Sequence, residues 1–125
     1  MSVIFADLNG LKTVNDNDGH VAGDTLLKNA SAALKEQFPV YEIFRAGGDE
    51  FVIIMTDTTI DELTKKAEKI RSSAENYDKL VFAIGTAFEE NTADIRRALH
   101  IADERMYEDK KRYYEAHPEK KRSSK

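Results

Sequence analysis

Two groups of carboxylates, distant from each other in the sequence, are of a type that could bind a metal ion. Asp7 ends the apolar run 3–6, and Asp49 and Glu50 follow two glycines between two further apolar runs. If these runs are strands that lie side by side, the carboxylates meet at one edge of the sheet. Oxygen ligands at this density suit Mg²⁺ or Mn²⁺, ions that keep open positions for substrate phosphates. Taken singly, Asp7 or Asp49 is better explained as a turn former.

Other kinds of reactive site find little support. The polar stretch 15–19 superficially resembles a calcium loop, but with Gly19 at the sixth position the first and twelfth ligands would be Val14 and Thr25. Neither is a carboxylate, so the spacing fails. With three histidines and no cysteine, a zinc site is not expected and a cysteine nucleophile is excluded.

The elements that must position the acids follow a regular order. Strands are predicted by apolar runs at 3–5, 41–44, 51–55 and 80–88. Helices are predicted by apolar residues at helical spacing at 23–37, 60–74 and 95–113. Thr59 and Glu62 form a capping box, Asn91 can cap the last helix, and residues 15–19 are expected to form a turn. The pattern favours an α+β or α/β fold in which helices pack around a mixed sheet with an antiparallel hairpin.

Length, composition and charge restrict the kind of protein. The chain has 125 residues, 41% hydrophobic and 34% charged, which is enough for one globular domain. We expect this domain at 1–116 and a basic, disordered tail at 117–125. The net charge of −4, carried by an acidic body, argues against a nucleic-acid partner and against membrane contact. The lack of cysteine and of a long apolar run predicts a cytoplasmic setting.

Two stretches of the sequence together resemble the motifs of the GGDEF family, the catalytic domains of diguanylate cyclases. The first is DLNGLKTVND at 7–16, continued at 19–20 and 23–24, and the second is RAGGDEF at 45–51. Similar residues at 102–107 extend the resemblance, which covers about residues 3–111. It implies a nucleotidyl-cyclase-like fold and an enzyme that condenses two GTP molecules into cyclic di-GMP.

The resemblance also implies a role for each matching residue. Two Mg²⁺ or Mn²⁺ ions in each active site would be held by the carboxylates of Asp7 and Asp49 and the backbone carbonyl of Leu8. Asp49 would also activate the 3′-hydroxyl, with Glu50 in support, and Lys12 would stabilise the transition state. The implied substrate-binding residues are Gly10 and Leu11 at the β- and γ-phosphates, Lys110 and Lys111 at the terminal phosphate, Asn15 and Asp24 at the guanine edge, and His20 close to the substrate.

The residue types agree with this reaction. The 3′-hydroxyl of one GTP attacks the α-phosphorus of another, pyrophosphate leaves, and a second attack closes the ring. Because each domain would offer one GTP half-site, the resemblance implies a homodimer. A sensory or regulatory domain is expected on the amino-terminal side. In the full-length protein, the catalytic domain could in this way be tethered to a membrane sensor.

Three features depart from the family pattern. Members normally have a turn and a helix before the first strand, whereas this sequence starts just ahead of Asp7, so we expect an amino-terminally truncated domain. After Lys110 the family often has a glycine, an arginine and a last strand, whereas residues 111–114 continue a helical pattern. Arg112 is a candidate replacement for that arginine, which binds phosphate. An inhibitory Arg-x-x-Asp motif is replaced by residues 38–41.

Two alternatives to a diguanylate cyclase stay open. One is a catalytically weak GTP-binding or dimerising regulatory module, and the presence of all the acids speaks against it. The other is a cyclase that makes a mixed or adenine-containing dinucleotide. Asp24 favours guanine, because a carboxylate only accepts hydrogen bonds and guanine offers N1–H and N2–H₂ donors.

Overall fold

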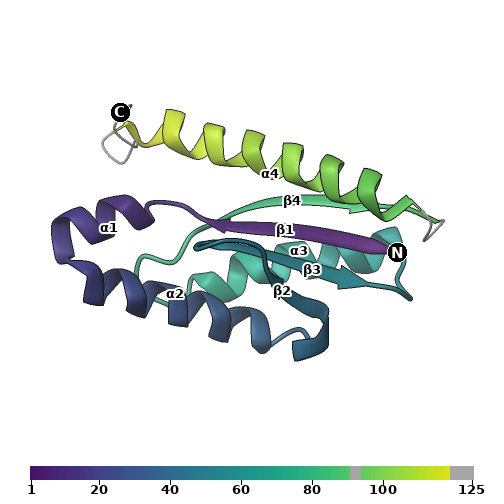
Figure 1. Ribbon diagram of the computed structural model, residues 1–125, viewed down its shortest axis with the longest axis horizontal. Helices are drawn as coiled ribbons and strands as arrows, with labels where there is room; N and C mark the ends of the chain where they lie inside the picture. The colour runs from purple at the N-terminus through teal and green to yellow at the C-terminus, as the bar shows by residue number, and fades with distance from the viewer. Residues whose placement is uncertain (91–93, 119–125) are drawn as a thin grey trace.

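A four-stranded sheet with helices on both faces forms the molecule. The computed structural model describes residues 1–90 and 94–118 (Figure 1). The strands are β1 (Ser2–Leu8), β2 (Ile43–Arg45), β3 (Glu50–Met55) and β4 (Phe82–Phe88). The helices are α1 (Leu11–Asp18), α2 (His20–Lys35), α3 (Ile60–Ala74) and α4 (Ile95–Ala116), with a 3₁₀ turn η1 at Val40–Glu42. The predicted fold class, α+β with helices packed around the sheet, is confirmed.

The sheet is antiparallel throughout its described strands, rather than mixed. Its order is β2-β3-β1-β4, and every neighbouring pair is antiparallel, including the predicted hairpin. The helical connections from β1 to β2 and from β3 to β4 each pass over one strand of the sheet. The strands that a helix joins are therefore parallel to each other but separated by an antiparallel strand.

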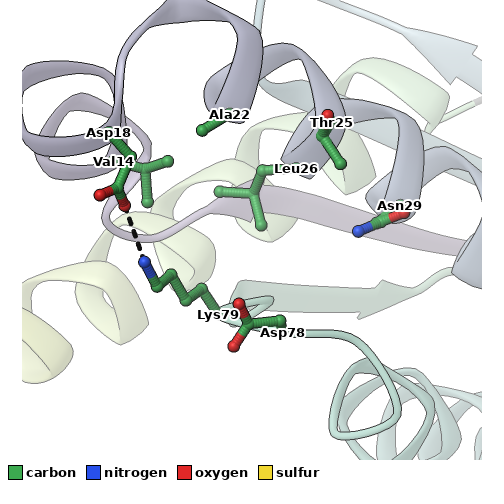
Figure 2. A pocket seen from close by; sticks show the side chains of 8 residues that line it. All are labelled: Val14, Asp18, Ala22, Thr25, Leu26, Asn29, Asp78 and Lys79. Carbon is green, nitrogen blue, oxygen red and sulfur yellow. Dashed lines mark hydrogen bonds and ion pairs between the residues drawn. The ribbon is translucent and has the colours of Figure 1, made fainter.

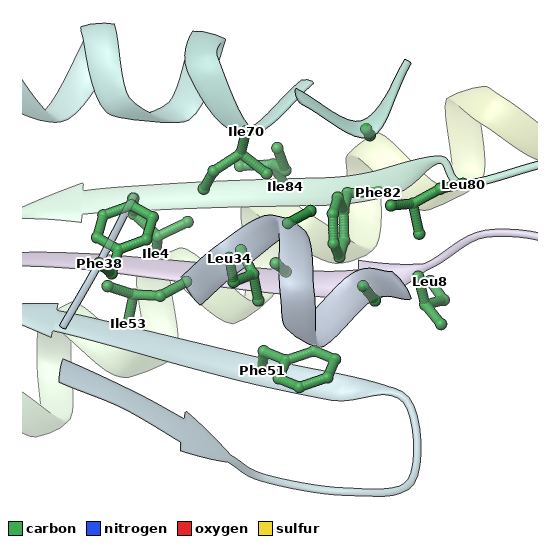
Figure 3. Packing of buried hydrophobic residues seen from close by; sticks show 14 of the residues in the cluster. Ile4, Leu8, Leu34, Phe38, Phe51, Ile53, Ile70, Leu80, Phe82 and Ile84 are labelled. Carbon is green, nitrogen blue, oxygen red and sulfur yellow. The ribbon is translucent and has the colours of Figure 1, made fainter. Parts of the chain in front are cut away.

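The two faces of the sheet are covered by different helices, and β1 contributes to both. Successive residues of a strand point to opposite faces. Ile4 and Leu8 belong to the larger core, which is shared with α2 and α3 (Figure 3). Val3 belongs to a smaller core with residues of α4. The same alternation sets Asp7 on the α4 side of the sheet, opposite to Leu8.

Helix α4 lies very close to β4. A Cβ added at Gly85 would be 2.0 Å from the backbone oxygen of Ala102, so no larger residue fits without displacing the helix. The helix runs on to Ala116, which confirms the predicted helical course of residues 111–114. Its carboxyl-terminal turns reach the end of the molecule where α1 lies (Figure 1).

Local predictions can be compared with the elements observed. The capping box of Thr59 and Glu62 is confirmed. The turn predicted at 15–19 is wrong, because α1 continues through Asp18 and only Gly19 interrupts the helical course. Packing of α1 against α2 outweighs the weak helix propensity of its Asn and Asp residues. The predicted cap Asn91 and the tail residues 119–125 lie outside the described residues. Within the described ranges, no helix has the length and apolar character needed to span a membrane.

Candidate active site

The carboxylates of the two motifs lie at one edge of the sheet. β1 and β3 pair in a register that sets Asp7 opposite Glu50. The backbone N–H of Leu8 also donates to the carbonyl oxygen of Asp49, with an N···O distance of 3.2 Å. The end of β1 and the tip of the hairpin are therefore adjacent, as the sequence predicts.

Arg45 stabilises the hairpin tip that carries Asp49. Its guanidinium donates hydrogen bonds to the carbonyl oxygens of Gly47 and Gly48, and it lies 5.9 Å from the centre of the Phe51 ring. These carbonyls belong to a tight turn, where backbone acceptors would otherwise depend on water. This structural role of Arg45 is not among the predicted functions.

Lys110 contacts two of the predicted metal ligands. Its Nζ atom donates to Asp7 Oδ2 at 2.9 Å and to the carbonyl oxygen of Leu8 at 3.1 Å. Both side chains are largely shielded from water, with 12% of the Lys110 side chain and 9% of the Asp7 side chain exposed. The predicted phosphate-binding lysine thus contacts two of the predicted metal ligands.

Asp7 is held in an environment that disfavours its charge. Burial raises the pKa of Asp7 from 3.8 to about 6, although the hydrogen bond and the charge of Lys110 act in the opposite direction. The nearby carboxylates of Asp49 and Glu50 add to the increase. Asp7 Oδ1 is buried and accepts no hydrogen bond. One lysine therefore does not fully compensate the negative charge at this edge.

The residues at the sheet edge fit a divalent cation. A cationic group already lies against Asp7 Oδ2 and the Leu8 carbonyl, and Asp7 Oδ1 has unused acceptor capacity. Carboxylate and carbonyl oxygens are the ligands that Mg²⁺ and Mn²⁺ prefer. Across the described residues, no three acidic or histidine side chains are grouped closely enough to hold a metal ion by themselves. Complete coordination would therefore need backbone oxygen, water or substrate phosphate as well.

The turn between β1 and α1 presents backbone N–H groups beside these acids. Gly10 precedes α1 with φ 77°, a left-handed conformation that favours glycine. Its N–H donates to the hydroxyl of Tyr114 at 2.8 Å. Leu11 and Lys12 form the start of α1, where the helix dipole and the N–H groups favour an anion. The predicted phosphate turn thus lies next to the predicted metal ligands.

Tyr114 is a site residue that the sequence interpretation missed. It lies four positions after Lys110 on α4, so both side chains belong to the same face of the helix. Lys110 contacts Asp7 and Leu8, while Tyr114 contacts Gly10. The helical spacing from Lys110 was the available signal, together with the helical course predicted for residues 111–114.

The predicted base-binding residues lie on α1 and α2. Asn15 packs against buried Gly23, where an added Cβ would be 1.7 Å from Asn15 Oδ1, so it lies beside the residue that precedes Asp24. Asp24 is exposed and lines an open cleft of about 420 Å³ between α2 and the β2–β3 hairpin. The other lining residues of the cleft are Leu27, Lys28, Ser31, Ile43, Arg45 and Phe51. His20, at the start of α2, and Lys111 on α4 are both exposed.

A different cavity lies between the α1–α2 pair and the loop before β4 (Figure 2). It has a volume of about 300 Å³, and its lining includes an ion pair between Lys79 and Asp18 at 2.7 Å. None of the predicted site residues lines it. The cavity is therefore separate from the acids at the sheet edge.

Comparison with known proteins agrees with this geometry. Residues 1–115 match the family model described as diguanylate cyclase, GGDEF domain. The diguanylate cyclase DosC of Escherichia coli K12 is 34% identical over 122 residues, which cover 90% of this chain and 26% of DosC. This chain thus spans about a quarter of the length of that relative.

Two solved structures are similar to the chain in both fold and sequence. A microbial GGDEF domain studied for its interaction with cyclic di-GMP has a TM-score of 0.75 and 32% identity, with 87% of this chain and 71% of that chain covered. The GGDEF domain of PA1120 from Pseudomonas aeruginosa has a TM-score of 0.77 and 29% identity, with 89% and 76% covered. The family model, the curated relative and the fold all lead to one assignment: this chain belongs to the GGDEF domain family of diguanylate cyclases.

Proposed function

We propose that this domain is a diguanylate cyclase that condenses two GTP molecules into cyclic di-GMP and two pyrophosphates. The observation that carries the proposal is that Asp7, the Asp49-Glu50 tip and the amino terminus of α1 lie together at one edge of the sheet. Oxygen ligands for cations are thereby next to N–H donors for phosphate. Membership of the GGDEF family supports the proposal.

The acids hold and deprotonate the reacting groups. Asp7, the Leu8 carbonyl and Asp49 would bind two Mg²⁺ or Mn²⁺ ions, which lower the pKa of the attacking 3′-hydroxyl and neutralise the leaving pyrophosphate. Asp49 accepts the proton of that hydroxyl, and Glu50 supports its position from the next residue of the tip. The partly compensated charge of Asp7 supports this assignment, because a buried carboxylate with an unpaired oxygen gains most from a cation.

The phosphates would be held by the turn and by lysine side chains. The N–H groups of Gly10 and Leu11 donate to β- and γ-phosphate oxygens, and Lys12 offsets the charge that develops in the transition state. A cation bound to Asp7 and the Leu8 carbonyl oxygen would replace Lys110 there, and the ammonium of Lys110 would then be available to pair with the terminal phosphate. Lys111 is exposed, so it adds positive charge from the periphery.

The base would lie along α2. Asp24 accepts hydrogen bonds from guanine N1–H and N2–H₂ in the cleft that it lines, and Asn15 contributes a second polar contact. Leu27 and the apolar part of the cleft cover a face of the base. His20 lies exposed at the start of α2, where it contacts the substrate from the solvent side.

Each domain provides one half-site, so the enzyme acts as a homodimer in which two GTP molecules face each other. We place the reaction in the cytoplasm and expect a sensory or regulatory domain on the amino-terminal side to control the encounter of two copies. Linking two half-sites can raise their effective concentration to about the millimolar range.

A second candidate function is a weakly active GTP-binding or dimerising module. The contacts of Lys110 with Asp7 and Leu8, and of Tyr114 with Gly10, favour it, because a ligand must replace all of them. Such a domain would bind GTP but convert little of it.

Incubation of the chain with GTP and Mg²⁺, followed by chromatography of the products, separates the two functions. A cyclase yields cyclic di-GMP and pyrophosphate, and Asp49→Asn abolishes both while GTP binding remains measurable. Asp103→Asn, the same change at an exposed position of α4, is the matched control and should retain activity. Binding of GTP without any product would support the regulatory module instead.

A further inference from the structure

The hydroxyl of Tyr114 is bonded to the same backbone N–H that the proposed function assigns to phosphate. Tyr114 Oη lies 2.8 Å from Gly10 N, in a partly buried position. The amide donates, so the hydroxyl is the acceptor and its own proton is directed elsewhere. At the amino terminus of a helix, this oxygen stands where an oxygen of an anion would bind.

The carboxyl-terminal turns of α4 hold Tyr114 in this position. Its ring packs edge to face against Tyr113, with centroids 5.4 Å apart. Tyr113 stacks on His117 at 4.3 Å, and a ring nitrogen of His117 lies 2.9 Å from the Tyr113 carbonyl oxygen. One turn earlier, Lys110 holds the helix to Asp7. Tyr114 is therefore part of an ordered contact between α4 and the site.

Arg112, the candidate for the missing phosphate-binding arginine, is placed less favourably. Its guanidinium lies 3.6 Å from Asp109 on the same helix, and 66% of its side chain is exposed. Tyr114, two positions further along α4, accepts the hydrogen bond from Gly10 N–H. A tyrosine, rather than an arginine, is thus in reach of the phosphate turn.

We infer that Tyr114 is a specificity-determining residue that donates a hydrogen bond to the β- or γ-phosphate of the bound nucleotide. The inference rests on the proposed function. A phosphate oxygen that accepts from Gly10 N–H takes the position of the Tyr114 oxygen, and a small outward movement with rotation of the O–H leaves the hydroxyl able to donate to that oxygen. The hydroxyl would form a directional hydrogen bond with the phosphate but add no positive charge to the site. Because the contact lies beyond the α-phosphate, it distinguishes a nucleoside triphosphate from a monophosphate.

The variant Tyr114→Phe tests this, because it removes the hydroxyl and keeps the ring packed on Tyr113. The ligands are GMP and a GTP analogue with a methylene group between the α- and β-phosphorus, which cannot react, each with Mg²⁺. Titrations followed by amide NMR signals measure both affinities, and the same spectra without ligand report the Gly10 amide. Tyr107→Phe is the matched control, since Tyr107 is exposed on the same helix.

We expect Tyr114→Phe to weaken binding of the triphosphate analogue by roughly three- to tenfold, the usual range for one lost hydrogen bond, and to change GMP binding less than twofold. The ligand-free signal of Gly10 should shift in this variant and not in Tyr107→Phe. Unchanged or tighter binding of the analogue would overturn the inference, since tighter binding would make Tyr114 an obstacle to the ligand. An equal loss for GMP would overturn it as well. If the unchanged protein bound neither ligand, the proposed function would fail, and the inference with it.

Discussion

The charge of Asp7 should make the metal-free domain less stable than the same fold without that charge. Burial raises the pKa of Asp7 from 3.8 to about 6, against the opposing effect of Lys110. At about 1.36 kcal/mol for each pKa unit, the ionised carboxylate lowers the free energy of unfolding by roughly 3 kcal/mol at pH 8. Asp7→Asn removes this cost but leaves Lys110 facing a neutral amide. We expect a net gain of roughly 1 to 3 kcal/mol in the free energy of unfolding.

The gain from Asp7→Asn should depend on pH in a defined direction. The pKa of Asp7 is higher in the folded chain, so the cost of its charge is absent below pH 3.8 and is complete once the pH has risen through about 6. The cost of the charge should fall by about half between pH 8 and pH 5, so the advantage of the variant should be smaller at pH 5 by roughly 1.4 kcal/mol. Urea denaturation in EDTA at both pH values measures the difference in the free energy of unfolding. In a thermal melt, each kcal/mol of that difference should shift the melting temperature by about 3 to 6 °C.

A control variant separates this effect from a general change in charge. Asp103→Asn removes an exposed carboxylate of α4 and should leave the free energy of unfolding nearly unchanged at both pH values. If Asp7→Asn proved less stable than the unchanged protein at pH 8, the ion pair with Lys110 would outweigh burial, and the reasoning about this site would be refuted.

Four further outcomes are expected. GTP should be preferred to ATP by roughly ten- to a hundredfold in competition binding, and Asp24→Ala should erode that preference; equal binding by the unchanged chain would contradict the assignment of the base site. Gly85→Ala should lower the free energy of unfolding by about 1 to 3 kcal/mol or more, because its Cβ meets α4 backbone, whereas Gly48→Ala, which meets open space, should change it little in urea melts. Buried Phe38 and exposed Tyr41 offer no guanidinium for cyclic di-GMP, so the product should not bind at this surface and should inhibit only at the active site. Calorimetry that showed micromolar product binding after Asp24→Ala would contradict this expectation. Activity per protein molecule should rise over a hundredfold concentration series, and a flat profile in a chain that sedimentation finds monomeric would rule out the two-half-site mechanism.

Much of the fold was predictable because its signals are local. Apolar runs indicated each strand, two glycines between such runs indicated the hairpin, and Thr59 with Glu62 indicated the start of α3. The meeting of Asp7 with Asp49 followed from the expectation that their strands are neighbours, which the register of β1 and β3 bears out. Local propensity predicts a turn at 15–19, but residues 15–18 belong to α1, because the contact between Asn15 and Gly23 is not visible in local propensity.

The rest depends on contacts between distant parts of the chain. Hydrophobic patterning contains no direct record of strand order, so the passage of each helical connection over one strand could not be foreseen. Tyr114 and Gly10 are 104 positions apart in the sequence. Their hydrogen bond depends on the close packing of α4 against β4, which is possible because Gly85 has no side chain. Lys110 is predicted to bind the terminal phosphate, and its contacts with Asp7 and Leu8 join residues more than 100 positions apart, which local sequence patterns do not reveal.

The central position of β1 has a consequence for how the chain folds during synthesis. β1 is made before the other three strands, yet both of its edges are hydrogen-bonded to later ones, with Ser2 opposite Met55 of β3 and Phe88 of β4. Until those strands leave the ribosome, an apolar strand has two open edges, which are the sites where wrong pairing and aggregation begin. Closing such long loops before any pairing is gained also slows folding. Substitutions that delay the docking of β4 should therefore reduce the yield of folded protein before they reduce its equilibrium stability.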